Sequence, residues 1–183
     1  MLAMDVDGVL TDGRIGWAAD AAGALTELKS FNVKDGLGIS VALAAGLHVA
    51  WITGRLSPIV ERRARELNVT EVVQWARNKR TALEELRGRL GLGRDEVLYL
   101  GDDLNDLPAF DAAGVRVAVA DAVADVRRSA DWITKTPGGH GAVREVVEEL
   151  LQSRGEWEPA VQAFLARLEE EQHRTPPGTA PAQ

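Results

Sequence analysis

The stretch Asp5-Val6-Asp7-Gly8-Val9-Leu10-Thr11-Asp12-Gly13 decides the fold, because it places two carboxylates at the end of a short apolar strand expected over residues 2–6. Side chains two residues apart lie on the same face of a strand. Asp5 and Asp7 should therefore point the same way at the carboxyl edge of a sheet, where α/β proteins bind ligands. Gly8 then lets the chain turn sharply. Such a pair suits a Mg²⁺ ligand or a nucleophile beside an acid or base; a solvated turn is the alternative.

Short apolar runs alternate with amphipathic stretches along the rest of the chain, which is typical of an α/β protein with a mainly parallel sheet. Further strands are expected at 47–52, 71–75, 96–100, 115–119 and 131–133. Helical spacing of apolar residues predicts helices at 60–67, 83–90, 142–151 and 157–168. Ser57 before Pro58 is a capping signal for the first of these. The expected fold class is α/β, a Rossmann-like parallel sheet flanked by helices.

Two segments depart from this alternation. Residues 14–32 contain a glycine-bearing turn between two short apolar runs and predict a β-hairpin. Residues 172–183 are rich in proline and poor in apolar side chains, so a disordered tail is expected there. The predicted organisation is one domain over 1–154, with the hairpin as a flap at 14–32, followed by a C-terminal helix at 155–171.

Composition excludes several classes of function. The 183 residues include 28 acidic and 21 basic side chains, a net charge of −7, which argues against nucleic-acid binding and against docking on anionic membranes. The absence of cysteine excludes disulfides and a cysteine nucleophile, and three scattered histidines argue against a zinc site. No apolar run is long enough for a membrane span, and no signal peptide is expected. A cytoplasmic protein is the resulting expectation.

A second acidic cluster follows the strand at 96–100. It is Gly101-Asp102-Asp103-Leu104-Asn105-Asp106. Three carboxylates at a strand end repel one another unless a cation neutralises them. A polar loop with helix-capping acids is the alternative. Because the first strand also ends in acids, the two clusters together indicate a shared Mg²⁺ site, on which Asp5, Asp7, Asp102, Asp103 and Asp106 would converge.

Two shorter signals follow other strands. Thr53-Gly54-Arg55 ends the strand at 47–52, and a hydroxyl with the following amides can hold phosphate oxygens; a simple turn is the alternative. Lys79 follows Asn78 at the start of a helix. The helix dipole disfavours a cation at that end, so an anionic partner would explain the lysine, although an exposed surface lysine is the alternative.

Taken in order, these motifs resemble the four motifs of the haloacid dehalogenase superfamily. The residue identities within and around the motifs are more specific. They resemble the 3-deoxy-D-manno-octulosonate 8-phosphate (Kdo 8-phosphate) phosphatase family from about residue 2 to about residue 158. The matching stretches are 5–13, 31–36, 52–55, 78–79, 101–108 and 138–146.

The resemblance implies roles for individual residues. Asp5 would be the nucleophile that forms an aspartyl-phosphate, and Asp7 the general acid and then the general base. Mg²⁺ would be held by the carboxylates of Asp5 and Asp102 and the backbone carbonyl of Asp7. The phosphoryl group would be bound by Thr53, Gly54 and Lys79. The outer layer around the metal would comprise Asp103, Asn105 and Asp106.

The resemblance also implies an architecture without a cap domain, because the interval from Asp12 to Thr53 has room only for the hairpin and one helix. The family covers its open site by forming a homotetramer with clustered hairpins. In this chain the covering segment would be 138–144, which would reach a neighbour's site. Within it, His140 replaces the arginine usual in that motif.

The substrate implied is a sugar-acid phosphate. Arg55 suits the carboxylate of Kdo 8-phosphate and His140 is a second candidate contact, which would place the enzyme in lipopolysaccharide biosynthesis. The alternatives are a phosphatase of sialic-type nonulosonate 9-phosphates or of sugar phosphates in general. A further alternative is a non-catalytic partner domain of a cytidylyltransferase.

Overall fold

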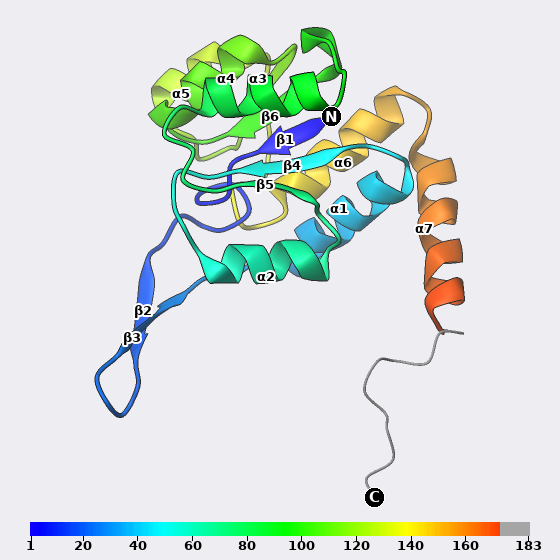
Figure 1. The fold of residues 1–183 in the computed structure, drawn as a ribbon. Helices are drawn as coiled ribbons and strands as arrows, with labels where there is room; N and C mark the ends of the chain where they lie inside the picture. Colours follow the sequence, from blue (N-terminus) through cyan, green and yellow to red (C-terminus); the bar gives the residue numbers. More distant parts are fainter. Residues whose placement is uncertain (173–183) are drawn as a thin grey trace, which may run out of the picture.

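A computed structural model describes residues 1–172 and shows a six-stranded parallel sheet (Figure 1). The strand order is β5-β4-β1-β6-β7-β8. The strands are β1 (Leu2–Met4), β4 (Val49–Ile52), β5 (Glu71–Val73), β6 (Leu98–Gly101), β7 (Val115–Ala118) and β8 (Trp132–Ile133). The expected parallel α/β sheet is thereby confirmed.

Helices cover both faces of the sheet (Figure 1). One layer consists of α3 (Lys79–Arg89), α4 (Leu107–Ala112) and α5 (Ala124–Ser129). The other consists of α1 (Val33–Ala44), α2 (Pro58–Glu66) and α6 (Ala142–Ser153), and α7 (Trp157–Gln172) packs on α1. Two 3₁₀ turns lie at Arg94–Glu96 and Leu104–Asp106.

The central strand determines where the site lies. β1 pairs with β4 on one side and β6 on the other, and its three residues are fully buried. Such burial on both faces requires an uninterrupted apolar run, which Leu2-Ala3-Met4 supplies. Because parallel strands end at the same edge, the segments after β1, β4 and β6 meet there.

The hairpin expected over 14–32 is present as β2 (Gly16–Ala19) paired antiparallel with β3 (Leu25–Leu28). The Asp20 side chain closes the turn by accepting the backbone N–H groups of Ala22 and Ala24 at 2.9 Å each. The hairpin projects from the body of the molecule (Figure 1). Between β1 and β4 the chain forms this hairpin and α1, which matches the expected architecture without a cap.

Some boundaries differ from the predictions. β1 ends at Met4, so Asp5 and Val6, which the prediction over 2–6 included in the strand, lie beyond it. α7 continues to Gln172, one residue into the segment predicted to be a disordered tail, and the rest of that segment, 173–183, lies outside the described residues. Among the described helices, none is both long and apolar enough to span a bilayer.

Candidate active site

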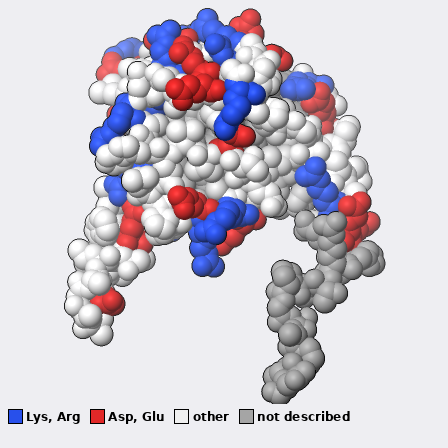
Figure 2. All heavy atoms as spheres, in the orientation of Figure 1, with Lys and Arg blue, Asp and Glu red and all other residues white. Residues whose placement is uncertain are grey.

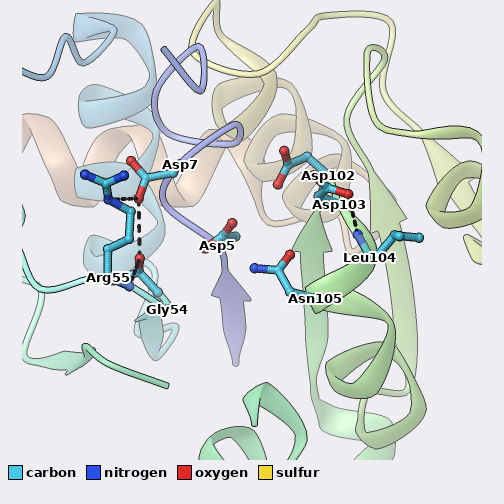
Figure 3. Close-up of a pocket in the computed structure, with 9 residues that line it drawn as sticks. Asp5, Asp7, Gly54, Arg55, Asp102, Asp103, Leu104 and Asn105 are labelled. Carbon is cyan, nitrogen blue, oxygen red and sulfur yellow. Dashed lines mark hydrogen bonds and ion pairs between the residues drawn. The ribbon is translucent and has the colours of Figure 1, made fainter. Parts of the chain in front are cut away.

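A polar pocket of about 350 Å³ opens at the carboxyl edge of the sheet (Figure 3). Its volume is in the range of small-molecule sites. The residues that line it follow β1, β4 and β6: Asp5, Asp7, Thr53, Gly54, Arg55, Asp102, Asp103, Leu104 and Asn105. Three separate motifs of the sequence therefore meet in one cavity.

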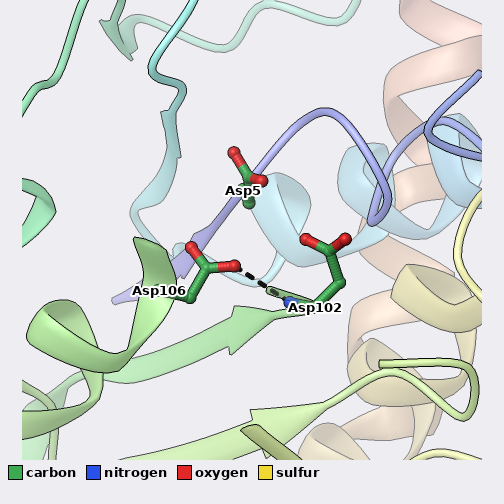
Figure 4. A group of neighbouring side chains, drawn as sticks. All are labelled: Asp5, Asp102 and Asp106. Atoms are coloured by element: carbon green, nitrogen blue, oxygen red, sulfur yellow. Dashed lines mark hydrogen bonds between the residues drawn. The ribbon is translucent and has the colours of Figure 1, made fainter. Parts of the chain in front are cut away.

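Three carboxylates gather at the floor of this pocket (Figure 4). Asp5, Asp102 and Asp106 each offer an oxygen, and these atoms lie within 4.8 Å of one another. Asp5 and Asp106 are buried, at 4% and 0% exposure. Gly8 makes the cluster compact, because a Cβ on it would lie 2.0 Å from Asp102 Oδ2, and its φ of +101° also favours glycine.

Asp106 organises the cluster with both of its oxygens. Oδ1 accepts hydrogen bonds from Lys79 Nζ at 2.7 Å and from the Tyr99 hydroxyl at 2.8 Å. Oδ2 accepts the backbone N–H groups of Asp102 at 2.9 Å and Asp103 at 3.3 Å. Asp106 has little remaining capacity to bind a metal, so its geometry suits a supporting position in the outer layer.

Lys79 lies between two of the carboxylates. It is the first residue of α3, and Asn78 caps that helix by accepting the N–H groups of Arg80 and Thr81. The ammonium lies 2.8 Å from Asp5 Oδ1 and 2.7 Å from Asp106 Oδ1, with only 1% of the side chain exposed. Burial alone would lower the pKa of Lys79, but the two carboxylates outweigh it and raise that pKa. The anionic partners anticipated for this lysine include carboxylates of the protein itself.

The charge of the cluster favours a further cation. Burial, with Asp106 second, raises the pKa of Asp5 to about 7. Burial, followed by the charges of Asp5 and Asp106, raises the pKa of Asp102 to about 8. Asp102 Oδ1 is also a buried oxygen with no hydrogen-bond partner among the described residues. Carboxylate oxygens are the donors that Mg²⁺ prefers, so the residues present fit a Mg²⁺ ion beside Asp5 and Asp102.

The carboxylate of Asp7 turns away from this cluster (Figure 3). It forms an ion pair with Lys29, lies 3.8 Å from Arg55 Nε and accepts a long hydrogen bond of 3.5 Å from the Thr53 hydroxyl. Asp103 is also not in the cluster, because it is exposed and its side chain accepts the N–H of Leu104 at 2.7 Å. Of the five acids expected to converge on one cation, the structure brings together the side chains of Asp5, Asp102 and Asp106, and it places those of Asp7 and Asp103 outside this group.

The hairpin supplies two residues that the sequence analysis missed. Glu27 Oε1 accepts a hydrogen bond from Arg55 Nη2 at 2.6 Å, and Lys29 lies 3.5 Å from Glu27 Oε1 as well as against Asp7. The available signal was the spacing of Glu27 and Lys29, which puts both on one face of an extended segment, opposite the exposed Leu28.

Ser57 precedes α2 as predicted, but its side chain does not cap the helix. Its hydroxyl instead donates to Glu27 Oε2 at 2.6 Å. The capping signal thus located the helix correctly, whereas the hydroxyl connects the helix start to the hairpin.

The segment 138–144 packs on its own chain. The N–H of Gly139 donates to Val9 O at 2.8 Å, and Gly138 fits so closely that a Cβ would lie 1.7 Å from Gly8 O. Its last residues begin α6. Its glycines allow it to support, within its own chain, the loop that follows Asp5. That the segment also reaches a neighbour's site stays a prediction. His140 is exposed, bonds Gly138 O at 2.7 Å and does not line the pocket.

Comparison with known proteins finds a matching family model and similar curated relatives. Residues 49–146 match the family model described as haloacid dehalogenase-like hydrolase. The 3-deoxy-D-manno-octulosonate 8-phosphate phosphatase of Escherichia coli (strain K12) is 43% identical over 160 residues, which cover 87% of this chain and 83% of the relative.

Solved structures of phosphatases with the same substrate name have a similar fold. The 3-deoxy-D-manno-octulosonate 8-phosphate phosphatase of Moraxella catarrhalis, in complex with magnesium ion, phosphate ion and Kdo, superposes with a TM-score of 0.82 at 41% identity, covering 89% of this chain and 91% of that one. The cobalt-bound phosphatase of Haemophilus influenzae gives a TM-score of 0.80 at 41% identity, covering 90% and 95%.

Proposed function

Because the chain belongs to the haloacid dehalogenase-like hydrolases, within the family of 3-deoxy-D-manno-octulosonate 8-phosphate phosphatases, we propose that it is a Mg²⁺-dependent phosphatase. It hydrolyses Kdo 8-phosphate to the free sugar acid and inorganic phosphate. The observation that carries this function is the group of Asp5, Asp102 and Asp106, with Lys79 between Asp5 and Asp106, beside an open polar pocket that Asp5 and Asp102 line.

Asp5 is the nucleophile in this mechanism. One of its carboxylate oxygens forms a bond to phosphorus while the bond from phosphorus to the sugar oxygen breaks, and Asp7 gives its proton to the departing alkoxide. Asp7 then takes a proton from a water molecule, which attacks the aspartyl-phosphate, releases phosphate and regenerates Asp5. In the structure the carboxylate of Asp7 points away from that of Asp5, which suits Asp5 as the nucleophile and Asp7 as a separate acid and base.

Cations must offset the repulsion between an anionic nucleophile and a phosphate dianion. Lys79 supplies one charge 2.8 Å from Asp5, and Thr53 and Gly54 line the pocket, where the hydroxyl and the amide would bind phosphoryl oxygens. Mg²⁺ would be held by the carboxylates of Asp5 and Asp102 and the carbonyl of Asp7. When bound, the ion neutralises charge on the transferring phosphoryl group.

Arg55 is the proposed contact for the substrate carboxylate. It lines the pocket, and about a third of its side chain, 36%, is exposed. A planar guanidinium can pair with a carboxylate through more than one N–H group, so Glu27 does not use all of its donors. His140 lies outside the pocket lining, which leaves Arg55 as the better candidate.

We also propose that the enzyme works in the cytoplasm as a homotetramer, in which neighbouring chains cover the pockets. Support comes from the hairpin, where four large apolar side chains are more than half exposed (Ile15, Trp17, Leu25 and Leu28). Figure 2 shows this projection as largely uncharged on the face in view. An exposed apolar patch of this kind is typical of protein–protein contacts.

Phosphate release tests the function. Wild-type protein with Mg²⁺ is assayed on Kdo 8-phosphate, on a nonulosonate 9-phosphate and on simple sugar phosphates, with the highest kcat/KM expected for Kdo 8-phosphate. Equal values across the panel would indicate a broad sugar phosphatase instead. Asp5→Asn and EDTA treatment should each abolish activity, while Asp95→Asn, at an exposed acid outside the pocket, should retain it.

A further inference from the structure

The base of the hairpin enters the active site. Lys29 follows β3 directly, and only 3% of its side chain is exposed although the hairpin around it is largely open to solvent. Its ammonium pairs with Asp7 and lies 3.5 Å from Glu27 Oε1. A buried lysine is costly unless it is paired, so this local burial indicates that the contact has a function.

Glu27 connects the same strand to the opposite wall of the pocket. Its Oε1 accepts from Arg55 Nη2 and its Oε2 from the Ser57 hydroxyl, both at 2.6 Å. Because Ser57 and Arg55 lie between β4 and α2, these bonds fasten the hairpin to the loop that contains Thr53 and Gly54. Lys29 is thereby held at a fixed position relative to Asp7 and to the loop that contains Thr53 and Gly54.

The consequence concerns the direction in which Asp7 points. Asp7 is two residues from Asp5, yet its carboxylate is absent from the group formed by Asp5, Asp102 and Asp106. The groups that hold it elsewhere are Lys29, Arg55 and Thr53. Lys29 is the one of these groups that the hairpin contributes.

We propose that Lys29 is a positioning residue that holds the Asp7 carboxylate on the leaving-group side of the pocket, away from the metal site, and that Glu27 fixes both Lys29 and Arg55. This assignment rests on the proposed function, because it takes Asp7 as the acid of that reaction. It makes the hairpin a part of each chain's own active site, in addition to any role in assembly.

A pair of substrates separates positioning of Asp7 from a structural effect. A sugar alkoxide needs a proton to leave, whereas p-nitrophenolate leaves without one. Lys29→Met removes the ammonium but keeps an unbranched chain that tolerates burial. We expect kcat/KM, which reports the first chemical step, to fall about 30-fold or more on Kdo 8-phosphate, since acid catalysis typically contributes about 100- to 10,000-fold, and less than about threefold on p-nitrophenyl phosphate.

The control is Lys34→Met, because Lys34 is an exposed lysine near the hairpin and makes no ion pair in the described part of the chain. It should leave both rates unchanged. Retained activity on p-nitrophenyl phosphate shows that the Lys29 variant is folded and binds metal. A fall of equal size on both substrates, or no fall on either, would overturn the proposal.

Glu27→Gln is a second variant that does not remove the lysine. It should raise KM for Kdo 8-phosphate several-fold, because Arg55 loses its fixed partner, with little change on p-nitrophenyl phosphate. Glu85→Gln, at an exposed helical position, is its control. If wild-type protein hydrolyses p-nitrophenyl phosphate but prefers another alkyl phosphate to Kdo 8-phosphate, the proposed substrate fails, while the Lys29 comparison is made with the preferred alkyl phosphate and still decides its own question.

Discussion

At the level of single residues, the raised pKa values of Asp5 and Asp102 link stability to pH. Both are about 3.8 in the unfolded chain and about 7 and 8 in the folded one. Between these limits the folded state holds protons that the unfolded state has lost, so the free energy of unfolding falls as pH rises. Mg²⁺ replaces those protons and should reverse the loss.

We therefore expect the Tm of metal-free protein to decrease from about pH 5 to about pH 8, and the increase in Tm on adding Mg²⁺ to be larger at the higher pH. Thermal unfolding in EDTA and in MgCl₂ measures both. Asp102→Asn, which removes one of the two groups, should show a shallower decrease. A Tm of the metal-free protein that rises over this interval would contradict the charge balance described for the cluster.

Gly54 is a second test at this level, because its neighbours in the protein do not explain why it is glycine. Its φ is not in the left-handed region, and a Cβ would have Ala76 O as its nearest neighbour at 3.9 Å. Gly54→Ala should therefore leave Tm unchanged. The added methyl would crowd the place proposed for a phosphoryl group, so kcat/KM should fall about tenfold or more.

Gly88→Ala is the matched control for this variant, since Gly88 lies in α3 with nothing near its Cβ position. It should keep full activity and gain up to about 1 kcal/mol of stability from helix propensity. Full activity of Gly54→Ala would show that the phosphoryl group does not approach this loop.

At the level of elements, the contact between the loop after β1 and the segment before α6 should govern metal binding. Gly138 packs closely against the carbonyl of Gly8, and Gly8 in turn packs closely against the Asp102 side chain. Gly138→Ala should cost about 2 kcal/mol or more through this clash and weaken Mg²⁺ binding. Urea unfolding and a Mg²⁺ titration of the rate measure the two effects, with Gly88→Ala again as control. Unchanged Mg²⁺ affinity would show that the segment before α6 does not influence the metal site.

The sequence predicted the elements that have a clear hydrophobic pattern. All six sheet strands occur where apolar runs were found, and in each at least one end is shifted by one or two residues, because pairing with neighbours and not composition decides where a strand ends. α5 was missed because its six residues are too few to show helical periodicity.

The sequence also predicted which motifs form the site but not how each side chain is directed. Asp5, Asp102, Lys79 and Thr53 follow strands or begin a helix, so topology alone brings them together. The direction of Asp7 depends on Lys29, whose position is set by the hairpin and by Glu27. The only sign of these contacts in the sequence is that Glu27 and Lys29 are two residues apart. Close packing of Gly138 on Gly8 has no signal in a single sequence beyond glycine itself.

At the level of the whole molecule, the acidic net charge does not prevent anion binding. The net charge of −7 includes the carboxylates that hold the proposed metal, while Lys79, Lys29 and Arg55 are concentrated around the pocket. At short range, a few buried or half-buried cations outweigh distant surface acids, because solvent and salt screen the latter. The composition therefore argues against nucleic acid but is compatible with a small phosphate ester.

The exposed hairpin residues make the proposed tetramer testable. Wild-type protein should sediment at about four times the chain mass of 19.7 kDa. Trp17→Glu combined with Leu25→Glu should produce smaller species and reduce activity on the sugar phosphate, because the pocket then lacks its covering neighbour. Leu165→Glu changes an apolar residue of similar kind, 44% exposed on α7, and should not alter the sedimentation coefficient. A monomeric wild type would contradict the proposal.

The central position of β1 also sets the order in which activity can arise during synthesis. Leu2 pairs with Val49 on one side and Leu98 on the other, so β1 is synthesised well before either of the strands that it pairs with. The fold is rich in such non-local pairings, which slow folding. A nascent chain that carries Asp5 but not yet Asp102 would have the proposed nucleophile without the second carboxylate of the proposed metal site. On this mechanism, catalysis would begin only once translation has passed β6.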